Sequence, residues 1–106
     1  APALVGRATV LDTATLRVGG QVARIAGVIG FGGESARDMA VYLAGRDVAC
    51  TPAPERPGQH QCRAGARDLA EVVLFNGGGR AAADAPPGLL EAEQQARLAR
   101  RGIWAR

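Results

Sequence analysis

The chain has 106 residues, a length that corresponds to one domain with a single modest core. Apolar residues make up 47% of the sequence and charged residues 22%, which is the ordinary balance of a globular chain. No apolar run reaches the roughly 18 residues that a membrane-spanning helix requires. The net charge is +3, with arginines but no lysine, and the acidic residues are interspersed among them, so no stretch forms a basic nucleic-acid-binding block.

The first part of the chain predicts three strands followed by a helix. Turn signals at Asp12-Thr13-Ala14 and at Gly19-Gly20 separate the strands, which are expected over residues 4–10, 15–18 and 21–29. The third strand opens into the glycine-rich loop Gly30-Phe31-Gly32-Gly33. A helix with apolar residues at helical spacing is then expected over residues 33–45.

The second part predicts two more strands and two more helices. Residues 47–51 and 59–63 are expected to be strands, and the three prolines of residues 52–58 make the segment between them a loop. Residues 66–76 predict a second helix, after which residues 80–83 are extended. A third helix with proline in its first turn runs through Arg101 and stops at Gly102, and Ile103-Trp104 fold back.

This order of elements predicts a single α+β domain, mainly β, over residues 1–106. Three strands, a helix and two further strands is the order of a five-stranded Greek-key barrel of the OB type. The three helices would pack outside that barrel.

Cys50 and Cys62 are the two cysteines, and they fall on the strands that flank the proline-rich loop. An even cysteine count in a small domain predicts a disulfide and an oxidising compartment, and two free thiols are the alternative. Together with a sequence that starts at Ala1 rather than Met, this pair favours a periplasmic or extracellular location. A zinc site is not expected, because His60 and the two cysteines lack a fourth ligand and a CxxC pair.

Several stretches together carry a resemblance to a known family. They are VLDTATLRV at residues 10–18, VARIAGV at 22–28, GARDL at 65–69, GGGRA at 77–81 and EQQARLARRGIW at 93–104. Over nearly its whole length the chain resembles the staphylococcal nuclease (thermonuclease) family, and the closing stretch is the most specific part. The resemblance implies a nuclease-like barrel and, in the family, phosphodiester cleavage by one calcium ion, a glutamate and two arginines.

The catalytic positions of the family are only partly retained. The first catalytic arginine matches Arg24, whereas the two metal-binding carboxylates correspond to Ala14 and Ile29, and the general base corresponds to Gly32. An alanine, an isoleucine and a glycine offer neither the hard oxygen ligands that calcium needs nor a proton acceptor. The second arginine falls near Pro57, so that Arg56 is an adjacent candidate.

Glu34 lies two residues beyond the position of the base. A shift of the loop would bring it into the site, whereas the ordinary interpretation is a carboxylate favoured by the helix dipole in a first turn. Arg24 is the one charge in an apolar strand, and it is either an anion-binding residue or an arginine whose stem follows the wall of the sheet. We expect its guanidinium to be half-buried and paired with a carboxylate, a carbonyl or a bound anion.

The sequence therefore predicts a non-catalytic nuclease-like domain with a binding or structural role, no cofactor and no metal. Arg24, Phe31 and Arg56 are the expected binding residues, and Phe31 is either exposed at the mouth of the site or a buried plug. The partner is an unidentified protein or ligand. One alternative is a weak calcium-dependent nuclease rebuilt from Glu34, Arg24 and Arg56, and another is a nucleic-acid binder without cleavage, which the few aromatic residues disfavour.

Three further expectations concern the end of the chain. Glu93 is predicted to be a structural carboxylate with a backbone or arginine partner. Trp104 is expected in the core, like Tyr42. The sequence also places four arginines at the end of the third helix and just after it: Arg97, Arg100, Arg101 and Arg106. The helix dipole favours cations at this position, and contact with nucleic acid is the alternative interpretation.

Overall fold

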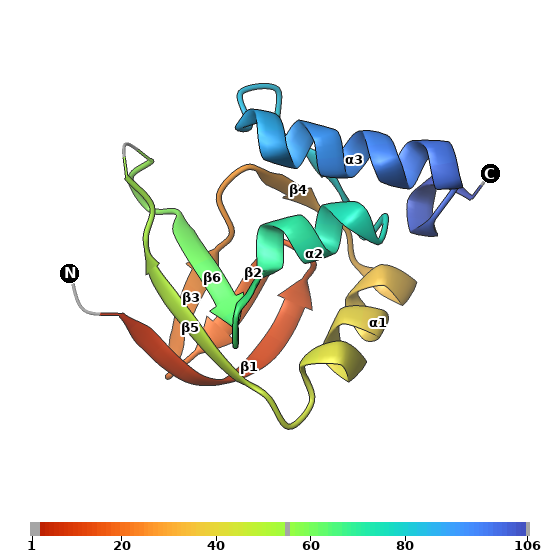
Figure 1. The fold of residues 1–106 in the computed structure, drawn as a ribbon. Helices are drawn as coiled ribbons and strands as arrows, with labels where there is room; N and C mark the ends of the chain where they lie inside the picture. The colour runs from red at the N-terminus through yellow and green to blue at the C-terminus, as the bar shows by residue number, and fades with distance from the viewer. Residues whose placement is uncertain (1–2, 55, 106) are drawn as a thin grey trace.

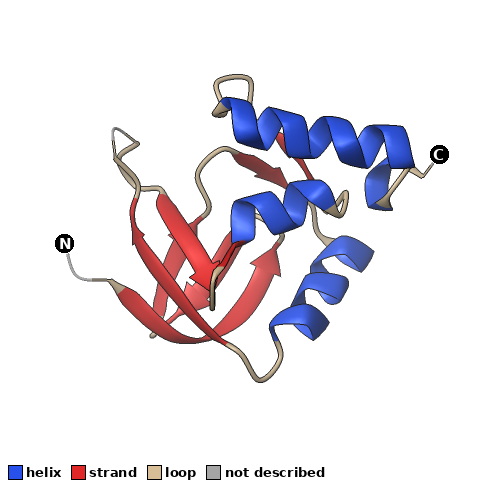
Figure 2. Ribbon diagram, in the orientation of Figure 1, coloured by secondary structure: helices blue, strands red, loops and turns tan. Residues whose placement is uncertain are grey.

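The computed structural model describes residues 3–54 and 56–105. Over these residues the chain is an α+β fold with three α-helices and a mostly antiparallel sheet, as the sequence predicts (Figures 1 and 2). The elements in chain order are β1 (Leu4–Asp12), β2 (Thr15–Val18), β3 (Gln21–Arg24), β4 (Val28–Gly30), α1 (Gly33–Leu43), β5 (Asp47–Pro52), β6 (His60–Ala64), β7 (Arg67–Asp68), α2 (Leu69–Phe75), β8 (Gly79–Ala81), α3 (Pro87–Ala99) and a 3₁₀ turn, η1 (Gly102–Trp104).

The larger sheet has the strand order β3-β2-β1-β5-β6-β7, with antiparallel neighbours throughout. Gly19 and Gly20 join β2 to β3 with φ values of 60° and 80°, which a two-residue hairpin of the favoured type requires. Side chains alternate between more and less exposed along β1, as expected for a strand with one face on the core. The core includes five fully buried aliphatic residues: Leu16, Val18, Val48, Leu69 and Leu74.

A single parallel bridge connects the two ends of this sheet. Ile25, just beyond β3, pairs with His60 at the start of β6, and the backbone N–H of Ala26 donates to the carbonyl of His60 over 2.9 Å. Over the described residues this contact does not extend into a continuous ladder, so the sheet does not close on itself.

The predicted third strand, residues 21–29, is wrong in its extent. The strand β3 ends at Arg24, Gly27 takes a left-handed φ of 83°, and the separate strand β4 pairs with β8 in a second, two-stranded sheet. A left-handed residue ends an extended run, and only glycine adopts it without strain. A side chain at Gly27 would also lie 2.8 Å from Leu89 Cδ1, so α3 packs directly against this turn.

The second helix begins later than predicted. Residues Arg67–Asp68 form the short strand β7 against β6, and Asp68 then caps α2 by accepting a hydrogen bond from the Ala70 N–H over 3.1 Å. The third helix ends at Ala99 rather than Arg101, because Arg100 adopts a left-handed conformation with φ 54°. Figure 1 shows the three helices gathered on one side of the larger sheet, with α3 lying beside α2.

The predicted disulfide is confirmed. Cys50 and Cys62 are bonded to each other and occupy directly paired positions of β5 and β6, with both side chains buried in the core. This pairing fits the expected oxidising location. In the part of the chain that the structure describes, none of the helices has the length and apolar character needed to span a bilayer.

Thr13 joins three segments that lie far apart in the sequence. Its side chain is 1% exposed, and its hydroxyl donates to the Gly78 carbonyl over 2.8 Å while accepting from the Phe31 N–H, also over 2.8 Å. Its own N–H donates to the Phe31 carbonyl. The β1–β2 turn, the end of β4 and the glycine-rich segment after α2 are thereby held together around one buried hydroxyl.

Candidate functional site

Arg24 and Arg56 line the same cleft, which has a volume of about 360 Å³ and is here called the arginine cleft. Its wall also includes Asp12 and Ala14 from the β1–β2 turn and Asp84 from the segment before α3. Two strands and a helix separate the two arginines along the chain, and the fold brings both to one concave surface. The cleft thus holds two guanidinium groups beside two carboxylates, those of Asp12 and Asp84.

Arg24 differs from expectation in its environment. It is the last residue of β3, pairs with Thr15 of β2 and is exposed rather than half-buried. Its guanidinium makes no hydrogen bond or ion pair with the residues that the structure describes. Because an exposed guanidinium is solvated by water, it does not need the internal partner that we expected for a half-buried one.

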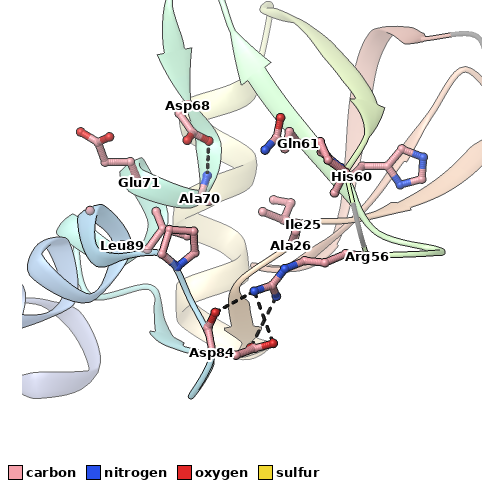
Figure 3. A pocket seen from close by; sticks show the side chains of 14 residues that line it. Ile25, Ala26, Arg56, His60, Gln61, Asp68, Ala70, Glu71, Asp84 and Leu89 are labelled. Atoms are coloured by element: carbon pink, nitrogen blue, oxygen red, sulfur yellow. Dashed lines mark hydrogen bonds and ion pairs between the residues drawn. The ribbon is translucent and has the colours of Figure 1, made fainter.

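Arg56 is held in place by Asp84 (Figure 3). Its Nη2 donates to the Asp84 backbone carbonyl over 2.8 Å and lies 3.4 Å from Asp84 Oδ2, while Nη1 lies 3.5 Å from Oδ1. The Arg56 side chain is 22% exposed and that of Asp84 is 78% exposed. The short backbone contact therefore orients the guanidinium, whereas the ion pair with a solvent-exposed carboxylate adds little.

A second cavity, of about 610 Å³, lies on the other side of this pair and is here called the lateral pocket. Ile25, Arg56 and Asp84 line both cavities, so the Arg56–Asp84 pair forms part of the wall between them. Leu89 of α3, Asp68 of β7 and Glu71 of α2 are among its other lining residues (Figure 3). Figure 3 shows the His60 ring directed away from Arg56 and Asp84, and its Nδ1 has no hydrogen-bond partner among the described residues.

In the resemblance, Ala14 and Ile29 stand at the two metal-ligand positions and Gly32 at the position of the base. All three lie in or next to segments that line the arginine cleft. Ala14 lines the cleft and is 8% exposed, Ile29 is 52% exposed on β4, and Gly32 precedes α1 with open space around it. Ala14 and Ile29 carry apolar side chains, and Gly32 carries none. None supplies a carboxylate to the cleft.

Asp12 stabilises its own turn. Its Oδ1 accepts a hydrogen bond from the Ala14 N–H over 2.7 Å. Gly30 packs against this turn so closely that a Cβ there would lie 2.5 Å from Ala14 N and 2.6 Å from Asp12 Oδ1. The turn and the end of β4 therefore form a fixed wall of the cleft that admits only glycine at position 30.

Glu34 and Phe31 lie outside the set of residues that line the arginine cleft. Glu34 is exposed in the first turn of α1, where the helix dipole favours a carboxylate. Phe31 is 37% exposed, so of the two interpretations left open by the sequence the structure has the exposed one. The fold thus brings Arg24 and Arg56 together and leaves the other two candidates apart from them.

Asp84 is the site residue that the sequence did not reveal. It is 28 positions from Arg56 and follows a run of alanines, so no local pattern marks it as a partner. Only the topology, which brings the segment before α3 against the proline-rich loop, could have identified it. Among residues 3–54 and 56–105, no three His, Cys, Asp or Glu side chains are grouped so that they could hold a metal ion.

Comparison with protein-family models and with curated proteins gives no match to this chain.

Proposed function

We propose that the chain is a non-catalytic domain of the staphylococcal nuclease type, a binding module whose arginine cleft holds an anionic group without cleaving it. The observation that carries this proposal is that Arg24 and Arg56 line one cleft, in which Ala14 stands at the position of a metal carboxylate of the family. The arginines remain able to attract an anion, and Ala14, Ile29 and Gly32 stand where the family has the carboxylates that hold the metal and activate water.

A barrel of the OB type is part of the proposal. The strand order β3-β2-β1-β5-β6 follows the order around such a barrel, in which the first and last strands of this order meet in parallel to complete the circle. The parallel bridge between Ile25 and His60 lies where that closure is expected. In a barrel closed by this single bridge, the arginine cleft and the lateral pocket would lie on either side of the Arg56–Asp84 pair.

The alternative of a weak nuclease draws support from the same two arginines, because phosphodiester cleavage also needs cations at the attacked phosphate. It needs a base as well: Glu34 does not line the cleft in the described chain, and the carboxylates that do, Asp12 and Asp84, are engaged by the Ala14 N–H and by Arg56. The position of Glu34 therefore favours binding over cleavage. Binding of nucleic acid without cleavage stays an alternative ligand class for the same cleft.

The test measures binding and cleavage on the same samples. Titration calorimetry with inorganic phosphate and with a short single-stranded oligonucleotide gives the affinity, and gel analysis of the oligonucleotide with calcium at alkaline pH gives the cleavage rate. We expect binding without cleavage, and an affinity at least about tenfold weaker in Arg24→Gln, because one charge-assisted contact is lost. Arg17→Gln, an exposed arginine on β2 outside the cleft, is the matched control.

Two results would contradict the proposal. Calcium-dependent cleavage that is lost in Glu34→Gln would establish the rebuilt nuclease. Equal loss of binding in Arg24→Gln and Arg17→Gln would place the anion outside the cleft. The triple variant Ala14→Asp, Ile29→Asp, Gly32→Glu tests the resemblance itself, and the exposed Ile29 and the open surroundings of Gly32 accommodate the new side chains at those two positions.

A further inference from the structure

Among the described residues, four arginines lie around the C-terminal end of α3 (Figure 1), and Arg106, which the sequence places with them, is outside the described residues. We call them the arginine patch, which consists of Arg80 on β8, Arg97 in the last turn of α3, and Arg100 and Arg101 just after it. The guanidinium groups of Arg80 and Arg97 lie 5.8 Å and 4.4 Å from the centre of the Trp104 ring. That of Arg101 lies 4.2 Å from the centre of the Phe75 ring.

Stacking on aromatic rings orients these arginines without using up their hydrogen-bond donors. A guanidinium stacks through its face, and its N–H groups remain in the plane and free for an anion. In Arg101 one of them, on Nη1, donates to the Phe75 carbonyl over 3.3 Å. The aromatic faces that carry the guanidinium groups are in turn not available for nucleobases, which disfavours single-stranded nucleic acid as the partner of this surface.

Among residues 3–54 and 56–105, no ion pair neutralises the charge of the patch. The ion pairs found among the described residues join Arg7 to Asp47 and Arg56 to Asp84, and neither involves the patch. Glu93 is the carboxylate of α3 closest to it along the chain, and its Oε2 accepts a hydrogen bond from the Ala81 N–H over 2.7 Å. The carboxylate of Glu93 is thus already engaged by a backbone N–H.

Helix stability accounts for only part of this arrangement. A cation in the last turn is favoured by the helix dipole, which explains Arg97. Arg80 is on a strand and gains nothing from that dipole. Arg100 occupies a left-handed position with φ 54°, where glycine is the favoured residue and an arginine costs stability.

Exposed apolar side chains accompany these charges. Leu98 beside Arg97 is 75% exposed, Phe75 under Arg101 is 42% exposed, and Ile29, which pairs with Arg80 across the β4–β8 sheet, is 52% exposed. Cations interspersed with protruding apolar groups are typical of surfaces that adsorb to anionic bilayers. We propose that the arginine patch is a peripheral contact surface for an anionic phospholipid bilayer, independent of the arginine cleft.

The test is sedimentation of the protein with vesicles of phosphatidylcholine alone or mixed with phosphatidylglycerol. We expect binding to the anionic vesicles only, and loss of binding at high salt because surface attraction is screened. The double variant Arg80→Gln/Arg97→Gln should lower the partition coefficient about thirty-fold, since each arginine near an anionic surface contributes about fivefold. Arg17→Gln/Arg63→Gln, with the same charge change on exposed residues of β2 and β6, should lower it much less.

Arg100→Gly keeps the proposal testable if the double variant fails to fold. It removes one charge of the patch at a position that prefers glycine, so it should fold at least as stably as the natural chain and bind about fivefold more weakly. Equal binding to both kinds of vesicle, equal loss in the patch and control variants, or unchanged binding in Arg100→Gly would each overturn the proposal. Binding to an oligonucleotide through the patch, without binding to vesicles, would overturn it in favour of nucleic acid.

Discussion

Replacing Thr13 with valine removes one hydroxyl and preserves the shape of the side chain. That hydroxyl is the shared partner of the Gly78 carbonyl and the Phe31 N–H, each at 2.8 Å, in a residue that is 1% exposed. Two backbone groups would lose their partner at once. An unsatisfied buried group costs about 1–3 kcal/mol, and partial access of water on the Phe31 side reduces the sum, so we expect a loss of about 2–4 kcal/mol.

A loss of this size is a large fraction of the roughly 5–15 kcal/mol that stabilises a typical domain. The assay is urea unfolding under non-reducing conditions, followed by circular dichroism. Thr13→Ser keeps the hydroxyl and removes one methyl group, so it should cost only about 1 kcal/mol. If Thr13→Val changed the free energy of unfolding by less than about 0.5 kcal/mol, or if Thr13→Ser cost as much as Thr13→Val, the hydroxyl would not be what holds the three segments together.

Three further predictions concern the crosslink, α3 and the wall of the cleft. Replacing both Cys50 and Cys62 with alanine should cost about 2–4 kcal/mol in urea unfolding, and mass spectrometry of the unreduced protein should find no free thiol. Glu93→Ala should lower the free energy of unfolding by about 1.5–3 kcal/mol, because the backbone N–H of Ala81 loses its charged acceptor. Glu93→Gln retains an acceptor and should cost less; equal costs would refute a stabilising role for this hydrogen bond. Arg56→Gln should change stability by less than about 1 kcal/mol, since its carboxylate partner Asp84 is exposed, yet weaken anion binding in calorimetry; unchanged binding would remove Arg56 from the site.

The features that could be predicted from the sequence are those specified by short stretches of chain. Gly19-Gly20 between two apolar runs specifies a hairpin, and the structure has β2 over the predicted residues. The cysteines could be paired because both fell on the strands on either side of one loop. Glu93 was expected to have a backbone or arginine partner, and it accepts a hydrogen bond from the Ala81 N–H.

The features that could not be predicted depend on contacts between distant segments. Gly27 inside an apolar run is compatible with a continuous strand, and only the packing of Leu89 against it explains why the chain turns there. The exposure of Arg24 depends on where β3 ends, which follows from the same turn. Likewise the pairing of Arg56 with Asp84 requires the third helix to return to the proline-rich loop.

The disulfide has a consequence for the segment that carries Arg56. A hairpin ordinarily takes its register from the geometry of its loop, and a slip by one residue would turn the buried side chains of β5 and β6 toward solvent. Here the covalent bond between Cys50 and Cys62, which face each other across the ladder, sets the register instead. The chain between Pro52 and His60 can therefore accept insertions and substitutions without loss of the strand pairing, so the lining of the cleft can change while the strands that support it stay in register.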